Sequence, residues 1–246
     1  MYTDFANVYD VMMHDVNYAA WADYLSGLLA QNWVKPGAFC VECACGTGSL
    51  TIPLYQKGYK MLGIDLSDQM LSAAMRKSRE QGCTIPFIRQ DMARLAIGKK
   101  ADAILATCDG LNYLHPQKAE RFFAAASSQL RSGGVLIFDV STPWKLQNVL
   151  GDHTLTYTED SFSYIWENRW NPASHAVELH VTAFVRQPNN MYMRVVENQV
   201  QYAHEKDFLR ETLKQNGYED VCFYGGQTMQ PPKEDCERWH ITARKP

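Results

Sequence analysis

The chain of 246 residues has no block of basic residues, and its formal net charge is −3. Proteins that bind nucleic acid through its phosphates usually carry a basic face, so the charge pattern disfavours a nucleic-acid partner. No apolar run reaches the roughly 20 residues that a membrane-spanning helix needs. The first residues, MYTDFANVYDVMMHD, contain acids but no basic region of the kind that opens a secretory signal. We therefore expect a cytoplasmic protein with no membrane partner.

The cysteines do not complete a metal site. The stretch FCVECACGTGSL places Cys40, Cys43 and Cys45 close together. A closed zinc site needs a fourth ligand, usually from a second pair, but the other cysteines stand singly and His204 is not followed by the second histidine of an H-E-x-x-H motif. On a strand, Cys40 and Cys43 would also point to opposite faces. We expect no metal, and reduced, buried thiols.

Short apolar runs alternate with helical patterns in the first 140 residues. The runs that we predict as strands are 38–41, 60–64, 86–89, 101–106 and 135–140. The segments with helical spacing are 18–32, 50–58, 67–81 and 118–130. This alternation is typical of an α/β fold with a doubly wound, Rossmann-like, mostly parallel sheet. In such sheets, ligands bind outside the carboxyl ends of the strands.

The period of the pattern changes after about residue 144. Apolar and polar residues alternate over 162–170, 177–185 and 192–202, and turn-forming residues separate these runs. The aromatic run 162–170 predicts either a cap over a substrate, or a sheet face packed on the core or on the second subunit of a homodimer. A helix predicted at 205–216 and strands predicted at 221–224 and 239–243 then resume the alternation of helices and strands found in the first 140 residues.

These patterns predict how the chain is divided. Residues 1–144 and 203–246 would form one α/β domain around a seven-stranded sheet. Residues 145–202 would form a small antiparallel sheet inserted into it.

The glycines of the loop that follows the first predicted strand indicate a ligand site. Gly46 and Gly48 precede a helix, so main chain can approach a ligand closely there. A dinucleotide fingerprint G-x-G-x-x-G fits poorly, because Ala44 and Ser49 occupy glycine positions in one register and Thr51 in the other. A nicotinamide-dependent oxidoreductase is therefore the less favoured alternative.

Three acids end successive predicted strands. Glu42 suits a ligand with an ammonium group, because a carboxylate beside a pyrophosphate would be unfavourable. Asp65 can accept both hydroxyl groups of a ribose. Asp91 can accept a hydrogen bond from an adenine amino group.

Several segments resemble the class I S-adenosylmethionine-dependent methyltransferases. Residues 42–48, ECACGTG, are similar to that family's first motif, (D/E)-x-G-x-G-x-G. GIDLS at 63–67, QDM at 90–92 and GGVL at 133–136 resemble its later motifs in the same order. Ala44 stands where the family usually has glycine, and we expect a negative φ there.

The N-terminal segment resembles a narrower group. Tyr9-Asp10-x-Met12-Met13, followed by Tyr18 and Trp21, is similar to the bacterial YqeM-like methyltransferases of small-molecule type. This resemblance implies an N-terminal helix that closes over the cofactor, S-adenosylmethionine, and a small sheet inserted after the fifth strand. It implies cofactor contacts from Tyr18, Trp21, Glu42, Ala44, Cys45, Gly46, Thr47, Gly48, Asp65, Leu66, Met70, Asp91, Met92, Cys108, Asp109 and Asn112.

The implied reaction is in-line methyl transfer to a small molecule. Positioning and exclusion of water account for most of such a reaction, and the sequence does not choose among oxygen, nitrogen and carbon acceptors. The candidates for a base are Asp109, His115, Asp139 and His175. The Asn/Asp-Pro-Pro-Tyr/Phe signature of enzymes that methylate nucleic-acid bases is replaced by TCDG at 107–110. A sensor that binds the cofactor without catalysis is a further alternative.

Overall fold

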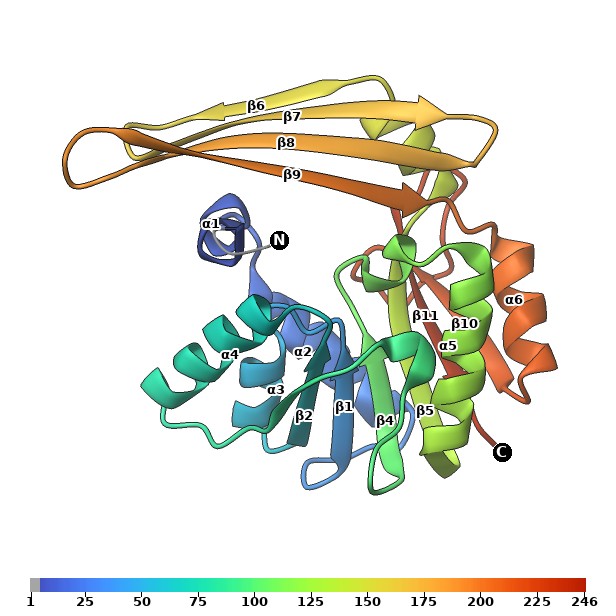
Figure 1. Cartoon of the computed structure of the whole chain (residues 1–246). Coiled ribbons are helices and arrows are strands. Elements are labelled where there is room, and N and C mark those ends of the chain that lie inside the picture. Colours follow the sequence, from blue (N-terminus) through green and yellow to red (C-terminus); the bar gives the residue numbers. More distant parts are fainter. Residues whose placement is uncertain (1–4) are drawn as a thin grey trace.

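The computed structural model describes residues 5–246 and shows two β-sheets, one lying above the other (Figure 1). The larger sheet has seven strands in the order β10-β11-β5-β4-β1-β2-β3. Strands β1 to β5 run parallel, and β11 is antiparallel to both β5 and β10. The bounds are β1 Phe39–Cys43, β2 Lys60–Asp65, β3 Phe87–Arg89, β4 Ala101–Ala106, β5 Leu130–Ser141, β10 Glu219–Gly225 and β11 Arg238–Arg244. The predicted seven-stranded, mostly parallel sheet is confirmed.

Helices cover both faces of this sheet because its strands are apolar on both faces (Figure 1). Cys40 packs in one core cluster, while Val41 and Cys43 pack in the other, so Cys40 and Cys43 do point to opposite faces. In the part of the chain that the structure describes, no group of three or more His, Cys, Asp or Glu could hold a metal. The helices are α2 Tyr18–Gln31, α3 Thr51–Gln56, α4 Asp68–Glu80, α5 Pro116–Gln129 and α6 Lys206–Gln215.

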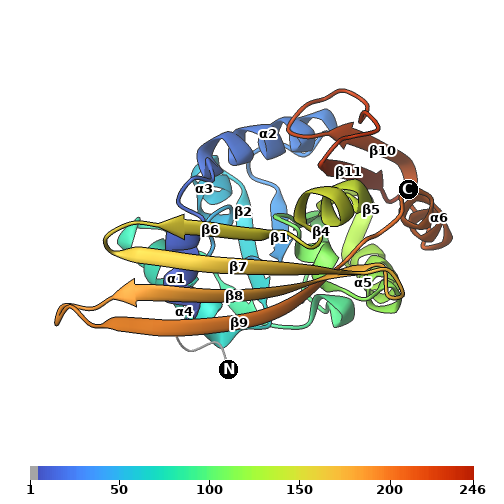
Figure 2. The ribbon, with the colours of Figure 1, turned by 90° about the horizontal axis from the view of Figure 1, so that it is seen from above.

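The smaller sheet, here called the cap sheet, lies across the carboxyl ends of the parallel strands (Figure 2). Its antiparallel strands follow in chain order: β6 Thr154–Thr158, β7 Phe162–Asn171, β8 Ala176–Arg186 and β9 Tyr192–Tyr202. The sequence predicted β7 to β9. It missed β6 and the π-helix η3 (Lys145–Leu150), because β6 is short and mostly exposed and η3 has only six residues, too few to show a periodic pattern.

The aromatic face of the cap sheet points toward the larger sheet. Phe162 packs with Val8 of helix α1 (Phe5–Met12), and Trp166 and Trp170 pack on Leu146 and Leu150 of η3. Helix α1 therefore lies between the cap sheet and the rest of the molecule (Figures 1 and 2). The domain division at residues 145 and 202, and a homodimer, stay predictions. Among residues 5–246, no helix is long and apolar enough to cross a membrane.

The chain leaves the cap sheet through a buried histidine. The His204 Nε2 atom lies 3.2 Å from the carbonyl oxygen of Leu111, and the His204 ring stacks on Phe208 with centroids 5.8 Å apart. Burial lowers the pKa of His204 to about 4 because the imidazolium form loses its hydration. The neutral ring therefore joins the end of β9 to the helix η2 (Gly110–Tyr113).

Protonation of His204 should destabilise the protein in mild acid. Between pH 6.5 and 4 the unfolded chain binds a proton at this histidine and the folded chain does not, so stability falls as the pH falls. We expect His204 to contribute a slope of up to about 1.4 kcal/mol per pH unit. Urea unfolding at several pH values would show a flatter dependence for His204→Gln than for wild type or for the exposed control His153→Gln. Parallel curves for all three proteins would contradict this expectation.

Candidate functional site

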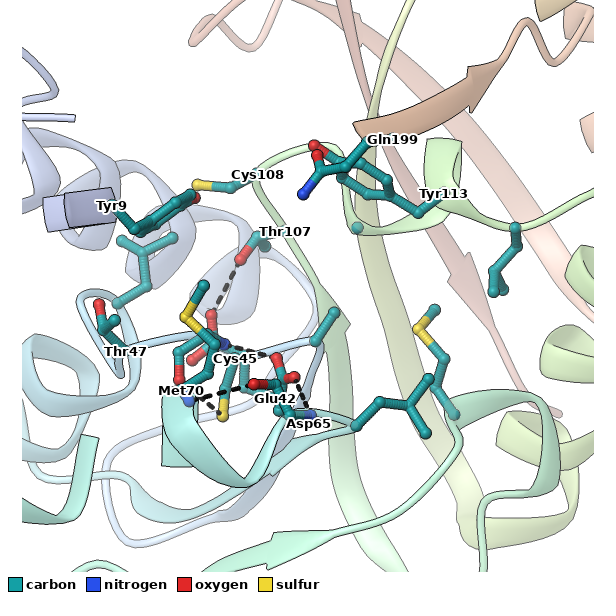
Figure 3. A pocket seen from close by; sticks show the side chains of 18 of the residues that line it. Tyr9, Glu42, Cys45, Thr47, Asp65, Met70, Thr107, Cys108, Tyr113 and Gln199 are labelled. Carbon is teal, nitrogen blue, oxygen red and sulfur yellow. Dashed lines mark hydrogen bonds between the residues drawn. The ribbon is translucent and has the colours of Figure 1, made fainter. Parts of the chain in front are cut away.

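A cavity of about 540 Å³ opens at the carboxyl ends of the parallel strands, under the cap sheet (Figure 3). Its volume lies within the roughly 300–1,000 Å³ range of small-molecule sites. Segments far apart in the sequence form the wall: α1, the glycine loop, the ends of β2 and β4, η2 and β9.

The Asp65 carboxylate holds the glycine loop in place. It accepts hydrogen bonds from the main-chain N–H groups of Gly46 and Ser67, each at 2.9 Å. Burial raises the pKa of Asp65, and these main-chain donors partly oppose that rise. Since each carboxylate oxygen has two lone-pair sites, Asp65 retains capacity for the hydroxyl groups of a ribose.

The glycine loop presents bare main chain to the cavity. Gly46 has φ +53°, and a Cβ added there would meet no atom within 4 Å. Gly48 has φ +75°, and its added Cβ would lie 3.2 Å from Cβ of Ala74, so this glycine serves the packing of the loop on α4. The loop could therefore approach a ligand at Gly46 without steric hindrance.

The expected negative φ at Ala44 is wrong. Ala44 adopts φ +53°, in the left-handed region that side chains disfavour. Its methyl group fits because it faces Gly110, where an added Cβ would lie 3.1 Å from Cβ of Ala44. The departure from the family's glycine is thus accommodated by a glycine 66 positions later in the chain.

Glu42 is a buried acid in the wall of the cavity. Its carboxylate accepts hydrogen bonds from the hydroxyl groups of Thr107, at 3.0 Å, and Thr51. Burial raises its pKa to about 7, although both threonines lower it. An ammonium group bound nearby would favour the ionised form.

Most of the predicted cofactor residues line the cavity. Their direct contact with a ligand stays a prediction. The residues in the wall are Tyr18, Glu42, Ala44, Cys45, Gly46, Thr47, Asp65, Leu66, Met70, Asp91, Met92 and Cys108. Those that the structure places outside the wall are Trp21, Gly48, Asp109 and Asn112.

Arg238 of β11 lies behind the cavity, between two carboxylates. Its guanidinium ion-pairs with Asp109 and Asp139, and Asp139 also accepts the main-chain N–H of Cys108 at 2.7 Å. Burial alone would raise the pKa of Asp109, but Arg238 holds it below its usual value. The base role predicted for Asp109 or Asp139 would require this ion pair to open.

Other predicted residues have structural partners. Asn112 donates to the carbonyl oxygens of Ser141 and Tyr202, both at 3.0 Å, and thereby joins η2 to β5 and β9. The Trp21 ring lies 5.3 Å from the Arg238 guanidinium.

Two histidines predicted as candidate bases lie outside the cavity wall. His115 precedes α5 and packs edge-on against Tyr202. His175 lies in the turn between β7 and β8 with φ +48°.

An N-terminal helix over the cofactor and a cap formed by the insertion were predicted, but the wall residues on α1, η2 and β9 were not among the predicted contacts. These side chains reach the site only because α1 and β9 cross above the larger sheet (Figure 1). Two features of the sequence could have indicated these wall residues. One is the resemblance at Tyr9, and the other is the end of the insertion near Tyr202. The additional wall residues are Tyr9, Ser49, Leu50, Ser67, Gln90, Thr107, Gly110, Tyr113, Leu114, Lys118, Asn198, Gln199, Val200 and Tyr202.

Comparison with known proteins identifies the family. A model of the methyltransferase domain matches residues 40–134. A protein of Geobacillus sp. (strain WCH70) that is named as a methyltransferase is 31% identical over 245 residues and covers 99% of each chain. YqeM of Bacillus subtilis, also named as a methyltransferase, is 30% identical and covers 100% of this chain and 97% of that protein.

A crystal structure of an S-adenosylmethionine-dependent methyltransferase from Clostridium acetobutylicum is similar in both fold and sequence. The TM-score is 0.88 at 30% identity, and the match covers 99% of this chain and 98% of that one. The chain belongs to the YqeM-like S-adenosylmethionine-dependent methyltransferases. The cofactor of this methyltransferase is thus S-adenosylmethionine and not a nicotinamide dinucleotide.

The residues present fit this cofactor. The main chain at Gly46 leaves room for a ligand, Asp65 can accept hydroxyl groups, and Glu42 is a buried acid that an ammonium group would favour. In the methyltransferase, these residues would hold the cofactor by its methionine and ribose parts.

The contact between Ala44 and Gly110 can be tested by a double-mutant cycle. Gly110→Ala should lower the free energy of unfolding by about 1–3 kcal/mol because the new methyl group would overpack against Ala44. Most of this loss should disappear in the Ala44→Gly background. Gly98→Ala is a matched control, since its added Cβ would meet nothing within 4 Å. If Gly110→Ala is as mild as the control, the proposed contact does not exist.

Ionisation of Glu42 should make cofactor binding depend on pH. Between pH 5.5 and 7.5, affinity for S-adenosylhomocysteine should rise with pH, by at most about tenfold per unit, because the ligand's ammonium group favours the carboxylate. Calorimetry should show no such rise for Glu42→Gln, nor for wild type with 5′-methylthioadenosine, which lacks the ammonium group. An equal rise in variant and wild type would assign the dependence to another group.

Proposed function

We propose that this methyltransferase transfers the methyl group to a small-molecule acceptor held between α1, η2 and β9. The observation that carries the proposal is the upper part of the cavity, where Tyr9 of α1, Cys108 of the turn after β4, Tyr113 of η2 and Gln199 of β9 surround one space (Figure 3). A space closed on several sides suits a small molecule better than a folded polymer. The absence of a nucleic-acid partner remains part of this proposal.

The order of the strands supports the position of the acceptor. Strands β3, β2, β1 and β4 are neighbours, so the residues that follow or end them, Asp91, Asp65, Glu42 and Cys108, lie in a row along one edge. Asp91 and Met92 would hold the adenine, Asp65 the ribose and the glycine loop the methionine part. The methyl group would then be presented near Thr107 and Cys108, below the space for the acceptor.

The residues around the acceptor space should position it and exclude water. Burial raises the pKa values of Tyr9, Tyr18 and Cys108, so these groups stay protonated and uncharged at neutral pH. Bound S-adenosylmethionine supplies a methyl group on a sulfonium that is already a good leaving group. The neutral wall would hold the acceptor in line with that methyl group, and such positioning accounts for much of the rate of a displacement.

A more distant relative also acts on a small molecule, according to its name. The magnesium-protoporphyrin O-methyltransferase of Synechocystis is 38% identical over 93 residues, which cover 37% of this chain and 40% of that protein. This partial match supports a small acceptor without identifying it.

The proposal can be tested by following a labelled methyl group. Cell extract incubated with the methyltransferase and methyl-labelled S-adenosylmethionine should yield, in the low-molecular-weight filtrate, a labelled product that chromatography separates from the labelled donor. Tyr113→Ala should lower this rate by roughly tenfold because an acceptor contact is lost, while affinity for S-adenosylhomocysteine stays within about twofold. Tyr192→Ala is a matched control, because Tyr192 is similarly exposed (50% against 44%) but lies outside the cavity wall.

Two results would contradict the proposal. One is label confined to precipitated protein or nucleic acid. The other is an equal rate for the Tyr113 and Tyr192 variants.

A further inference from the structure

A single lysine joins the N-terminal helix to the glycine loop. From α4, the Lys77 Nζ atom donates to both carboxylate oxygens of Asp10 on α1, at 3.0 and 3.1 Å. It also donates to the hydroxyl oxygens of Thr47 and Ser49, each at 2.9 Å. The side chain of Lys77 is 20% exposed and that of Asp10 is 36% exposed, so this cluster is partly shielded from water.

The charges at the ends of this cluster fix the direction of its hydrogen bonds. A lysine ammonium can only donate and an ionised aspartate can only accept. The Thr47 hydroxyl donates its proton to Asp10 at 2.6 Å. The Ser49 oxygen accepts from Lys77, and the Ser49 proton is donated to the Thr47 oxygen at 3.1 Å, because the Thr47 proton is already on Asp10.

Ser49 lies in the cavity wall together with Thr47 and Tyr18. Because its oxygen is held by Lys77, the Ser49 hydroxyl can turn its proton from the Thr47 oxygen to an acceptor on a ligand and keep the hydrogen bond from the lysine.

Ser49 lies at the end of the cavity that is assigned to the methionine tail of the cofactor. Adenine and ribose are assigned to the ends of β3 and β2. The next strand end in this row is that of β1 with the glycine loop, which is left for the methionine part. The methionine carboxylate is the group of the cofactor that needs hydrogen-bond donors at this end.

We propose that Lys77 is a positioning residue that holds the Ser49 oxygen so that the Ser49 hydroxyl can donate to the cofactor carboxylate. Through Asp10 it also holds α1, and with it Tyr9, over the cavity. The proposal rests on the assignment of S-adenosylmethionine and not on the acceptor proposed above. Its consequence is that Lys77 sets the preference for a cofactor that carries a carboxylate.

The test compares two ligands that differ in that carboxylate alone. Calorimetry with the whole protein would measure S-adenosylmethionine and decarboxylated S-adenosylmethionine, which keeps the amino group. Lys77→Met should weaken binding of the first roughly tenfold, the effect of one hydrogen bond to a charged group. Binding of the second should stay within about twofold, and Lys77→Arg should restore most of the difference.

Two further variants make the result decisive. Arg76→Met is a matched control on the same helix, because Arg76 forms an exposed ion pair with Glu80. Ser49→Ala should reproduce the carboxylate-selective loss even if Lys77→Met fails to fold, which thermal unfolding without ligand would reveal. Equal losses for both ligands, or no loss for either, would overturn the role of Lys77. Failure of wild type to bind either ligand would instead overturn the cofactor assignment.

Discussion

The hydrogen bonds from the main chain of Gly46 and Ser67 to Asp65 are the constraint on which the site depends. They join the loop after β1 to the loop after β2, so two neighbouring crossovers share one carboxylate. With its N–H bound, Gly46 stays in a left-handed conformation and its bare Cα faces the cavity. Because α3 follows the first of these loops and α4 follows the second, Asp65 also helps to set where these two helices begin.

Charge is distributed unevenly around the cavity. The carboxylates of Glu42, Asp65 and Asp91 belong to the wall below the cap sheet, while Arg238 is paired behind the wall with Asp109 and Asp139. Two carboxylates against one guanidinium leave this buried cluster with a net negative charge, and Asp139 contacts the main chain of Cys108. A cationic sulfonium would therefore meet the acids of the wall and of this cluster, while the side chains at the acceptor space are neutral phenol and thiol groups.

Local patterns predicted the larger sheet and its acids, because buried parallel strands are apolar runs and their last residues fall at one edge. The sequence could not predict features set by distant partners. The φ of Ala44 depends on Gly110. Asp109 meets Arg238, which lies 129 positions later, and Asn112 meets Tyr202 in the cap sheet. Tyr113 and Gln199 enter the wall only through the crossing of β9 over η2.

Helix α1 contacts segments that the ribosome completes much later. Asp10 needs Thr47 and Lys77, and Val8 packs on Phe162 and Val195. An isolated helix of eight residues is only marginally stable in water, so residues 5–12 have no complete docking site until β9 has emerged. Helix α1 is thus among the last elements to reach its final place, and a nascent chain arrested before residue 195 would hold strands β1 to β5 but lack β10, β11 and the complete docking site of α1.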